Sequence, residues 1–140
     1  MAPLKVGIIG ANATGAGWAA RAHLPAFKAG IPGVELAAVC TSRQESAEEA
    51  GKMFGVPAYW DHRKMLSEAD IDAVAVVVKL PHHYELAKDV IAASKHIYVE
   101  WPLCTTTAEA EEIRDLASKA GVATAIGLQS RHAAEYATIR

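Results

Sequence analysis

The sequence predicts an α/β protein built on a doubly wound parallel sheet, a Rossmann-like fold. Three observations lead to this prediction. Strand-like and helix-like segments alternate along the whole chain, as in right-handed βαβ crossovers. Near the N-terminus, a short apolar run passes through a loop of small residues into an amphipathic segment (LKVGIIGANATGAG, residues 4–17). Residues 73–78 (AVAVVV) are β-branched or alanine, which is typical of a central strand covered on both faces.

The elements follow in order along the chain. Strands are expected at residues 6–9, 34–40, 73–78, 96–99 and 122–128. Helices are expected at residues 18–29, 46–54, 61–67, 84–93 and 106–120, and in the tail from residue 133. Pro25 predicts an irregularity in the first helix, and Asp61 predicts an N-cap. Thr106 with Glu109 forms a capping-box pattern, and Gly121 suits the C-cap of that helix.

Composition narrows the functional classes. The 140 residues correspond to about one domain, and 51% of them are apolar, which argues against disorder. The net charge is −2 and the basic residues are scattered, so we expect no nucleic-acid partner. No leader pattern and no apolar run of about 20 residues is visible, so we expect no membrane association. Cys40 and Cys104 lie far apart without CxxC pairing, which favours a cytoplasmic protein.

The first loop fits a dinucleotide-binding fingerprint. Gly10, Asn12 and Gly15 occupy the three glycine positions of G-x-G-x-x-G, and asparagine tolerates left-handed backbone angles best after glycine. We expect backbone amides around Asn12, with Ala13 and Thr14 in the same loop, to converge on a diphosphate. A second register, from Gly15 through Gly17 to Ala20, also fits, and glycines mark ordinary turns as well. The absence of Gly-Lys-Ser/Thr disfavours a P-loop NTPase.

The end of the second expected strand indicates the cofactor. A site for NAD normally has Asp or Glu there, to bind the ribose hydroxyls. This chain has Thr41, Ser42 and Arg43 instead, and hydroxyls with a guanidinium suit a 2′-phosphate. NADP is therefore expected, with NAD possible. Ser42 and Glu45 also form a capping-box pattern, which is compatible with an anion at the same helix end.

Five motifs in order resemble the N-terminal domain of the Gfo/Idh/MocA oxidoreductases: VGIIGAN, AVCTSR, HYELA, VEWPL and GLQSR. The resemblance implies a dinucleotide-binding domain at residues 1–130. Residues 131–140 would then begin a connection to a C-terminal substrate domain. It also implies hydride transfer between a nicotinamide and a sugar-like or polyol hydroxyl, since the cofactor carries that chemistry.

The family usually has Glu-Lys-Pro in the fifth motif, often with a cis proline, and its lysine takes part in proton transfer. This chain has Glu100, Trp101 and Pro102, and an indole cannot act as a base near neutral pH. By resemblance, Glu100 lies near the nicotinamide ribose, although it equally suits the end of an exposed strand. His83 begins the family pattern H-x-x-L-A near the nicotinamide, where it is the candidate catalytic residue. The alternative is a helix-start histidine that binds backbone groups.

Other residues complete the expected site. Leu80, at the carboxyl end of the third expected strand, would pack against the adenine or a ribose, while Lys79 faces phosphate or solvent. Arg131, in the last motif, would contact cofactor or a substrate carboxylate, or stay idle. Trp18 and Trp101 would stack on the cofactor or fill an interface. The histidines show no ligand spacing, so no metal is expected.

Three functions remain open. Asn12, the lengthened first loop and the Glu-Trp pair resemble the family branch that contains the galactose-regulon repressor of budding yeasts, where the dinucleotide is a signal. The first of the three functions is the cofactor domain of an NADP-dependent oxidoreductase. The second is a catalytically silent sensor whose occupancy changes its affinity for a protein partner. The third is a bare folding unit that self-associates through the face meant for a second domain.

Overall fold

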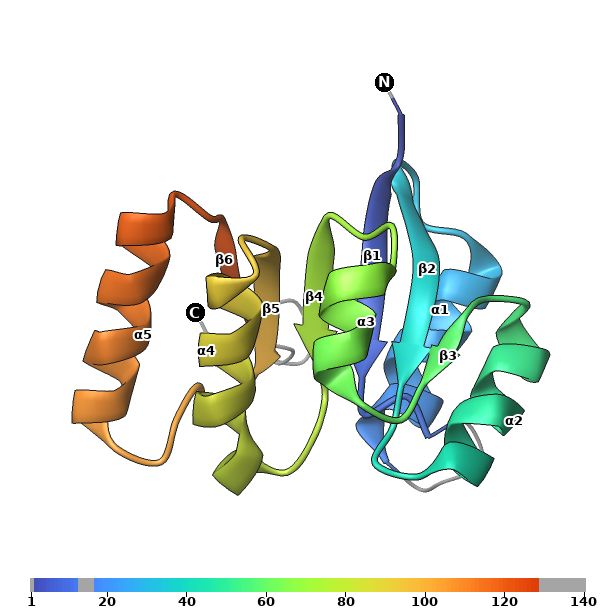
Figure 1. The fold of residues 1–140 in the computed structure, drawn as a ribbon, viewed down its shortest axis with the longest axis horizontal. Helices are drawn as coiled ribbons and strands as arrows, with labels where there is room; N and C mark the ends of the chain where they lie inside the picture. Colours follow the sequence, from blue (N-terminus) through green and yellow to red (C-terminus); the bar gives the residue numbers. More distant parts are fainter. Residues whose placement is uncertain (1, 13–16, 129–140) are drawn as a thin grey trace, which may run out of the picture.

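A parallel sheet forms the centre of the computed structural model, which describes residues 2–12 and 17–128. Within these ranges six strands pair in the order β3-β2-β1-β4-β5-β6 (Figure 1). They are β1 (Leu4–Ile9), β2 (Val34–Cys40), β3 (Ala58–Tyr59), β4 (Ala73–Val76), β5 (His96–Glu100) and β6 (Thr124–Gly127). All pairings are parallel, so the predicted doubly wound α/β sheet is confirmed.

Helices cover both faces of this sheet. The elements are η1 (Ala19–His23), α1 (Leu24–Ala29), α2 (Gln44–Phe54), α3 (His62–Glu68), η2 (Leu80–His82), α4 (His83–Ala92) and α5 (Thr107–Ala120). One apolar core packs α3, α4 and α5 against one face of the sheet, the face toward the viewer in Figure 1. A second core packs η1, α1 and α2 against the other face. β4 is buried along its whole length between the two cores, as its sequence predicts.

The predicted caps explain where two helices begin. Asp61 precedes α3, and its carboxylate accepts a hydrogen bond from the Arg63 amide (2.9 Å). Thr106 precedes α5 and forms a complete capping box with Glu109. Gly121 ends α5 in a left-handed conformation, with φ of 67°. These local contacts satisfy backbone groups that a helix end leaves without partners, so the sequence specifies these boundaries directly.

Several elements differ from expectation. β4 ends at Val76, two residues earlier than expected, and the short helix η2 was not expected. The first crossover begins as a π-helix, η1, and becomes α-helical at α1, where Pro25 occupies the first turn and needs no amide partner. β3 was not predicted, because a strand of two residues carries no periodicity. α2 begins at Gln44, two residues earlier than expected. The expected helix from residue 133 lies outside the described residues.

Candidate functional site

The strand order reverses between β1 and β4, and this switch point fixes where a ligand can lie. β1 connects through η1 and α1 to β2 on one side, and β4 connects through α4 to β5 on the other. Open α/β sheets bind ligands in the crevice at the carboxyl ends of the strands at such a point. The carboxyl ends of β1, β2 and β4 meet at the lower edge of the sheet in Figure 1. This edge is therefore the candidate site.

Gly10, which follows β1, must be glycine for a structural reason. Its φ of +95° is one that L side chains rarely adopt, and a Cβ there would lie 2.1 Å from the carbonyl oxygen of Val77. Its amide donates to the carbonyl oxygen of Cys40 (2.8 Å). The missing side chain thus lets the chain pass between the ends of β2 and β4, which is the sharp turn expected of the first fingerprint glycine.

The loop after Gly10 is held by its own backbone. The amide of Ala11 also donates to the Cys40 carbonyl oxygen (3.1 Å), and the amide of Asn12 donates back to the carbonyl oxygen of Gly10 (2.9 Å). In this conformation the hydrogen of the Asn12 amide is used within the turn. The cofactor contact assigned to Asn12 stays a prediction. The other predicted contacts of this loop, Ala13, Thr14 and Gly15, lie outside the described residues.

A pocket of about 450 Å³ opens at this edge of the sheet, and we name it the edge pocket. Its volume lies within the range of small-molecule sites, roughly 300–1,000 Å³. It is lined by Ile9, Cys40, Thr41, Ser42, Trp60, His62, Val78, Lys79, His82 and Leu86. Four of these carry chemically active or aromatic groups that the sequence did not indicate for the site: Cys40, Trp60, His62 and His82. The described lining contains no carboxylate, and the nearest acidic groups, Asp61 and Asp89, lie behind lining residues Cys40 and His62.

The short strand β3 explains why Trp60 was missed. Tyr59, the last residue of β3, pairs with Cys40, and the amide of Thr41 donates to the carbonyl oxygen of Tyr59 (3.1 Å). Trp60 therefore follows directly beside the end of β2, where the predicted residues Thr41 and Ser42 line the same pocket. A long-range pairing of this kind leaves no local pattern in the sequence.

Thr41 holds the turn between β2 and α2. It is buried, its hydroxyl donates to the carbonyl oxygen of Arg43 (2.8 Å), and it shares a hydrogen bond with the Ser46 hydroxyl (2.7 Å). The expected capping box of Ser42 with Glu45 does not form. The residue that precedes α2 is Arg43 rather than Ser42, and it makes no side-chain cap. Thr41 takes the role of organising this turn through hydroxyl contacts that the spacing did not reveal.

Ser42 and Arg43 remain exposed at the carboxyl end of β2. Ser42 lines the edge pocket, while Arg43 lines a neighbouring hollow of about 530 Å³ together with Gln44, Glu45 and Glu48. The guanidinium therefore stands beside two carboxylates of α2. An incoming phosphate would compete with them for Arg43.

Cys40 supplies an unreactive floor to the edge pocket. Burial, with a smaller contribution from the nearby negative charge of Asp61, raises the pKa of the Cys40 thiol to about 12. The thiol therefore stays protonated at neutral pH and behaves as a small apolar group.

His83, at the start of α4, is buried, with only 2% of its surface exposed. Its Nδ1 lies 2.8 Å from the carbonyl oxygen of Pro102, and its Nε2 lies 3.0 Å from that of Val78. A neutral imidazole carries one N–H, so one of these contacts is a hydrogen bond at any time. This ring joins the segment after β4 to the segment after β5. The geometry favours the backbone-binding alternative, and the catalytic assignment stays a prediction.

Glu100, at the end of β5, belongs to a buried polar cluster. Its Oε1 lies 2.5 Å from Nε2 of His23 in η1 and accepts a hydrogen bond from the Tyr98 hydroxyl (3.1 Å). Burial, and then the charge of Glu100, raise the pKa of Tyr98 to about 12. The cluster lies over Gly127 of β6, where a Cβ would approach the Tyr98 hydroxyl to 2.3 Å. Glu100 is thus tied into the fold rather than exposed at a strand end.

Trp101 directly follows β5, and Leu80 lies in the segment that follows β4. Trp101 is 64% exposed and precedes a cis bond to Pro102, as the family resemblance implied. Leu80 begins the short helix η2 and is half-buried. Arg131 lies outside the described residues.

The family comparison agrees with this architecture. Residues 4–128 match the model of the Gfo/Idh/MocA proteins, described as an oxidoreductase family with an NAD-binding Rossmann fold. The chain belongs to the Gfo/Idh/MocA family. The matched segment is the family's nucleotide-binding domain, and it includes β1 through β6.

Individual Gfo/Idh/MocA relatives have different roles. An inositol 2-dehydrogenase/D-chiro-inositol 3-dehydrogenase of Lacticaseibacillus casei is 36% identical over 80% of this chain and 32% of its own length. The galactose/lactose metabolism regulatory protein GAL80 of Saccharomyces cerevisiae is 29% identical over 93% of this chain and 32% of its own length. The chain therefore spans about a third of the length of these curated relatives.

A solved structure of a reductase superposes on nearly all of the chain. The 3-ketoreductase KijD10 of Actinomadura kijaniata, a lysine-to-alanine mutant in complex with TDP-benzene and NADP, has a TM-score of 0.88 and 28% identity. The superposition covers 98% of this chain and 42% of the KijD10 chain. The fold seen here is thus that of the family's N-terminal domain.

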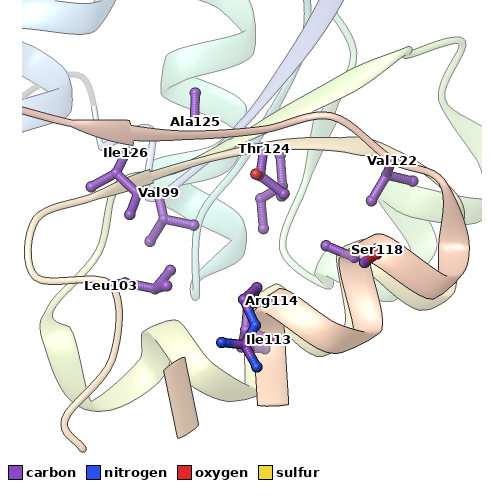
Figure 2. A pocket seen from close by; sticks show the side chains of 11 residues that line it. Val99, Leu103, Ile113, Arg114, Ser118, Val122, Thr124, Ala125 and Ile126 are labelled. Atoms are coloured by element: carbon purple, nitrogen blue, oxygen red, sulfur yellow. The ribbon is translucent and has the colours of Figure 1, made fainter. Parts of the chain in front are cut away.

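A second hollow lies away from the candidate site. It measures about 370 Å³ and separates α5 from β5 and β6. Figure 2 shows Val99 and Ile126 pointing from the strands toward α5, with Leu103 at one end. This hollow is apolar and faces α5, whereas the edge pocket lies at the carboxyl ends of the strands.

Neither a metal-binding cluster nor a membrane-spanning helix occurs in the described part of the chain. No group of three His, Cys, Asp or Glu side chains in it is arranged to hold a metal ion. Its helices are too short or too polar to cross a membrane.

Proposed function

We propose that this chain is the NADP(H)-binding domain of a Gfo/Idh/MocA-type oxidoreductase that acts on a sugar-like or polyol hydroxyl, with NAD as a weaker ligand. The edge pocket carries the proposal, because its described lining offers the Ser42 hydroxyl and the Lys79 ammonium group but no carboxylate. An NAD site normally has an acid at the end of β2 to bind the ribose hydroxyls. A cytoplasmic location belongs to the same proposal, since both cysteines are free.

The residues have distinct roles in this proposal. Ser42 and Arg43 bind the 2′-phosphate, and Thr41 holds the turn that presents them. Gly10 admits the dinucleotide to the switch point, with Asn12, Ala13, Thr14 and Gly15 forming the loop at its diphosphate. Leu80 packs against the adenine or the nicotinamide ribose, and Glu100 lies near that ribose. Trp101 contacts the cofactor, and Arg131 contacts the cofactor or a substrate carboxylate. When bound, the cofactor supplies the hydride chemistry.

The proposed function also includes a catalytic residue and a second domain. His83 is the acid–base candidate of this chain, and its use requires release of one of its two carbonyl contacts. Residues 131–140 begin the connection to a C-terminal substrate domain. The inositol dehydrogenase relative supports a polyol as the substrate class.

Calorimetric titration with NADP and with NAD tests this proposal. Arg43→Ala should weaken NADP binding roughly tenfold and leave NAD binding unchanged, because a charge-assisted hydrogen bond contributes about 1.5–3 kcal/mol. Arg114→Ala, an exposed arginine on α5, is the matched control. Equal loss for both cofactors would contradict the 2′-phosphate assignment, and no binding of either by the wild type would contradict the whole proposal.

A catalytically silent NADP sensor is the second candidate function. Trp101, which is exposed in place of the family lysine, favours it, because an indole neither accepts nor donates a proton near neutral pH. The regulatory relative GAL80 supports the same reading. In this case NADP occupancy changes the affinity for a protein partner, or for a second copy through the face that a further domain would cover.

Turnover separates the two candidates. A chain extended to the length of the relatives is assayed for a nicotinamide absorbance change with a panel of polyols. Sustained turnover excludes the sensor, whereas tight NADP binding without turnover across the panel excludes the oxidoreductase for those substrates.

A further inference from the structure

Trp60 is the largest side chain in the lining of the edge pocket, and it is 51% exposed. Exposing half of an indole to water has a cost, because apolar surface is more stable out of contact with water. The proposed contacts of Ser42 and Arg43 with a phosphate do not involve the Trp60 ring. A ligand bound in the edge pocket would cover the exposed face of the indole.

The backbone on both sides of Trp60 is fixed. On one side, Tyr59 pairs with Cys40 in the sheet and accepts a hydrogen bond from the Thr41 amide (3.1 Å). On the other side, the Asp61 carboxylate caps α3 through the Arg63 amide (2.9 Å). The indole therefore projects from a rigid junction between a strand and a helix. A ring on such a base loses little conformational entropy when a ligand packs on it.

The chemistry of the pocket selects a flat base attached to a sugar. Ile9, Val78 and the protonated thiol of Cys40 form an apolar floor. The exposed hydroxyl of Ser42 lies on the same lining and suits a ribose, while the Thr41 hydroxyl is used within the turn. Aromatic side chains bind nucleobases by stacking, since every base has a π face.

We propose that the Trp60 indole stacks on the adenine ring of the bound dinucleotide, an inference that rests on the proposed function. The edge pocket is then the adenosine subsite, with Trp60 as one wall and the apolar floor below the base. The phosphate-binding residues recognise the charged end, and Trp60 provides the affinity for the base.

Binding of fragments to the wild-type protein and to Trp60 variants tests the inference. AMP carries the base, and ribose 5-phosphate lacks it. Trp60→Ala should weaken AMP and NADP about tenfold and leave ribose 5-phosphate unchanged, whereas Trp60→Phe should retain most of the affinity. Met53→Ala, which removes another exposed apolar side chain on α2, is the control for lost surface. Thermal unfolding of each variant checks that the fold persists.

Tryptophan fluorescence gives a second readout that a merely structural role would not move. AMP should quench emission of the wild type, and the quench should disappear in Trp60→Phe. Unchanged NADP and AMP affinity in Trp60→Ala, or a full AMP quench in Trp60→Phe, overturns the stacking assignment and leaves dinucleotide binding intact. A wild type that binds neither NADP nor NAD overturns the proposed function, and the inference with it.

Discussion

The two halves of the sheet use their polar side chains in opposite ways. In the half formed by β1, β2 and β3, Ser42, Arg43 and Trp60 are exposed at the carboxyl ends of the strands. In the half formed by β4, β5 and β6, the His83 ring lies against backbone carbonyl oxygens, and the Glu100 carboxylate is bound by Tyr98 and by His23 of η1.

This difference separates binding from chemistry. The first half presents free groups to a ligand, and its features suit both candidate functions equally. The second half would contact the nicotinamide, and there the family lysine is replaced by Trp101 while Glu100 and His83 are tied into the fold. Whether the protein is an enzyme or a sensor is therefore decided in the second half. Three substitutions break or sharpen this contrast.

The largest effect is expected where the halves meet. Gly10→Ala should lower the free energy of unfolding by about 3 kcal/mol or more, because the new Cβ would lie 2.1 Å from the carbonyl oxygen of Val77 in a left-handed backbone conformation. NADP binding should be lost as well. Gly17→Ala is the control, since a Cβ at Gly17 meets no atom within 4 Å. Urea unfolding of both variants checks the prediction, and equal stability would show that the turn relaxes freely.

A smaller effect is expected in the second half. His83→Ala should cost about 2–3 kcal/mol, because it removes the ring's hydrogen bond to the carbonyl oxygen of Val78 or Pro102 and opens a cavity at a buried position. The exposed neighbour His82 is the matched control, and His82→Ala should change stability by about 0.5 kcal/mol or less. If urea unfolding finds the two variants equally stable, the contacts of the His83 ring contribute little to the stability of the fold.

The smallest effect concerns a contact that links the halves. Asp89 of α4 accepts from Arg63 Nε of α3 (3.0 Å) and lies 2.7 Å from Nε2 of His62. Burial alone would raise the pKa of Asp89, but the contacts with His62 and Arg63 outweigh it and hold that pKa below 3.8. A lowered folded-state pKa stabilises the protein above the unfolded value, and this stabilisation is lost as the pH falls below about 4.

Asp89→Asn should therefore lower the free energy of unfolding by about 1 kcal/mol or less at pH 6, and the difference should shrink toward pH 3. Asp115→Asn, in an exposed pair with Arg114, is the control. Unfolding curves measured across this pH range check the prediction. A difference between wild type and Asp89→Asn that stays constant with pH would mean that the ionised contact contributes nothing.

The same contrast explains what could be predicted from the sequence. The fold and most element boundaries follow from local signals, such as the apolar run of β4 and the capping box of α5. Ser42 and Arg43 were predicted because a strand end followed by a helix is a local pattern. Trp60 was missed because its place depends on the pairing of a two-residue strand with β2.

The polar contacts of the second half could not be predicted for a similar reason. The His83 ring meets carbonyl oxygens that are 5 and 19 residues away, and His23 meets Glu100 across 77 residues. Such contacts are set by how strands and helices pack, and no spacing rule encodes them. The turn at Asn12 shows the same limit at short range, because no spacing rule reveals that its amide donates to the carbonyl oxygen of Gly10.

The protonated thiol of Cys40 allows local opening of this sheet edge to be followed by the rate of thiol alkylation. Alkylating reagents attack the thiolate, which a pKa of about 12 makes scarce at neutral pH, and the sulfur lies on the buried floor. Labelling at Cys40 should therefore proceed only as fast as the strand ends part transiently, after the less buried Cys104 has reacted. The rate of labelling at Cys40 therefore reports local opening of the sheet edge. Any molecule bound there should slow this labelling, whether or not it absorbs light, carries a charge or reacts.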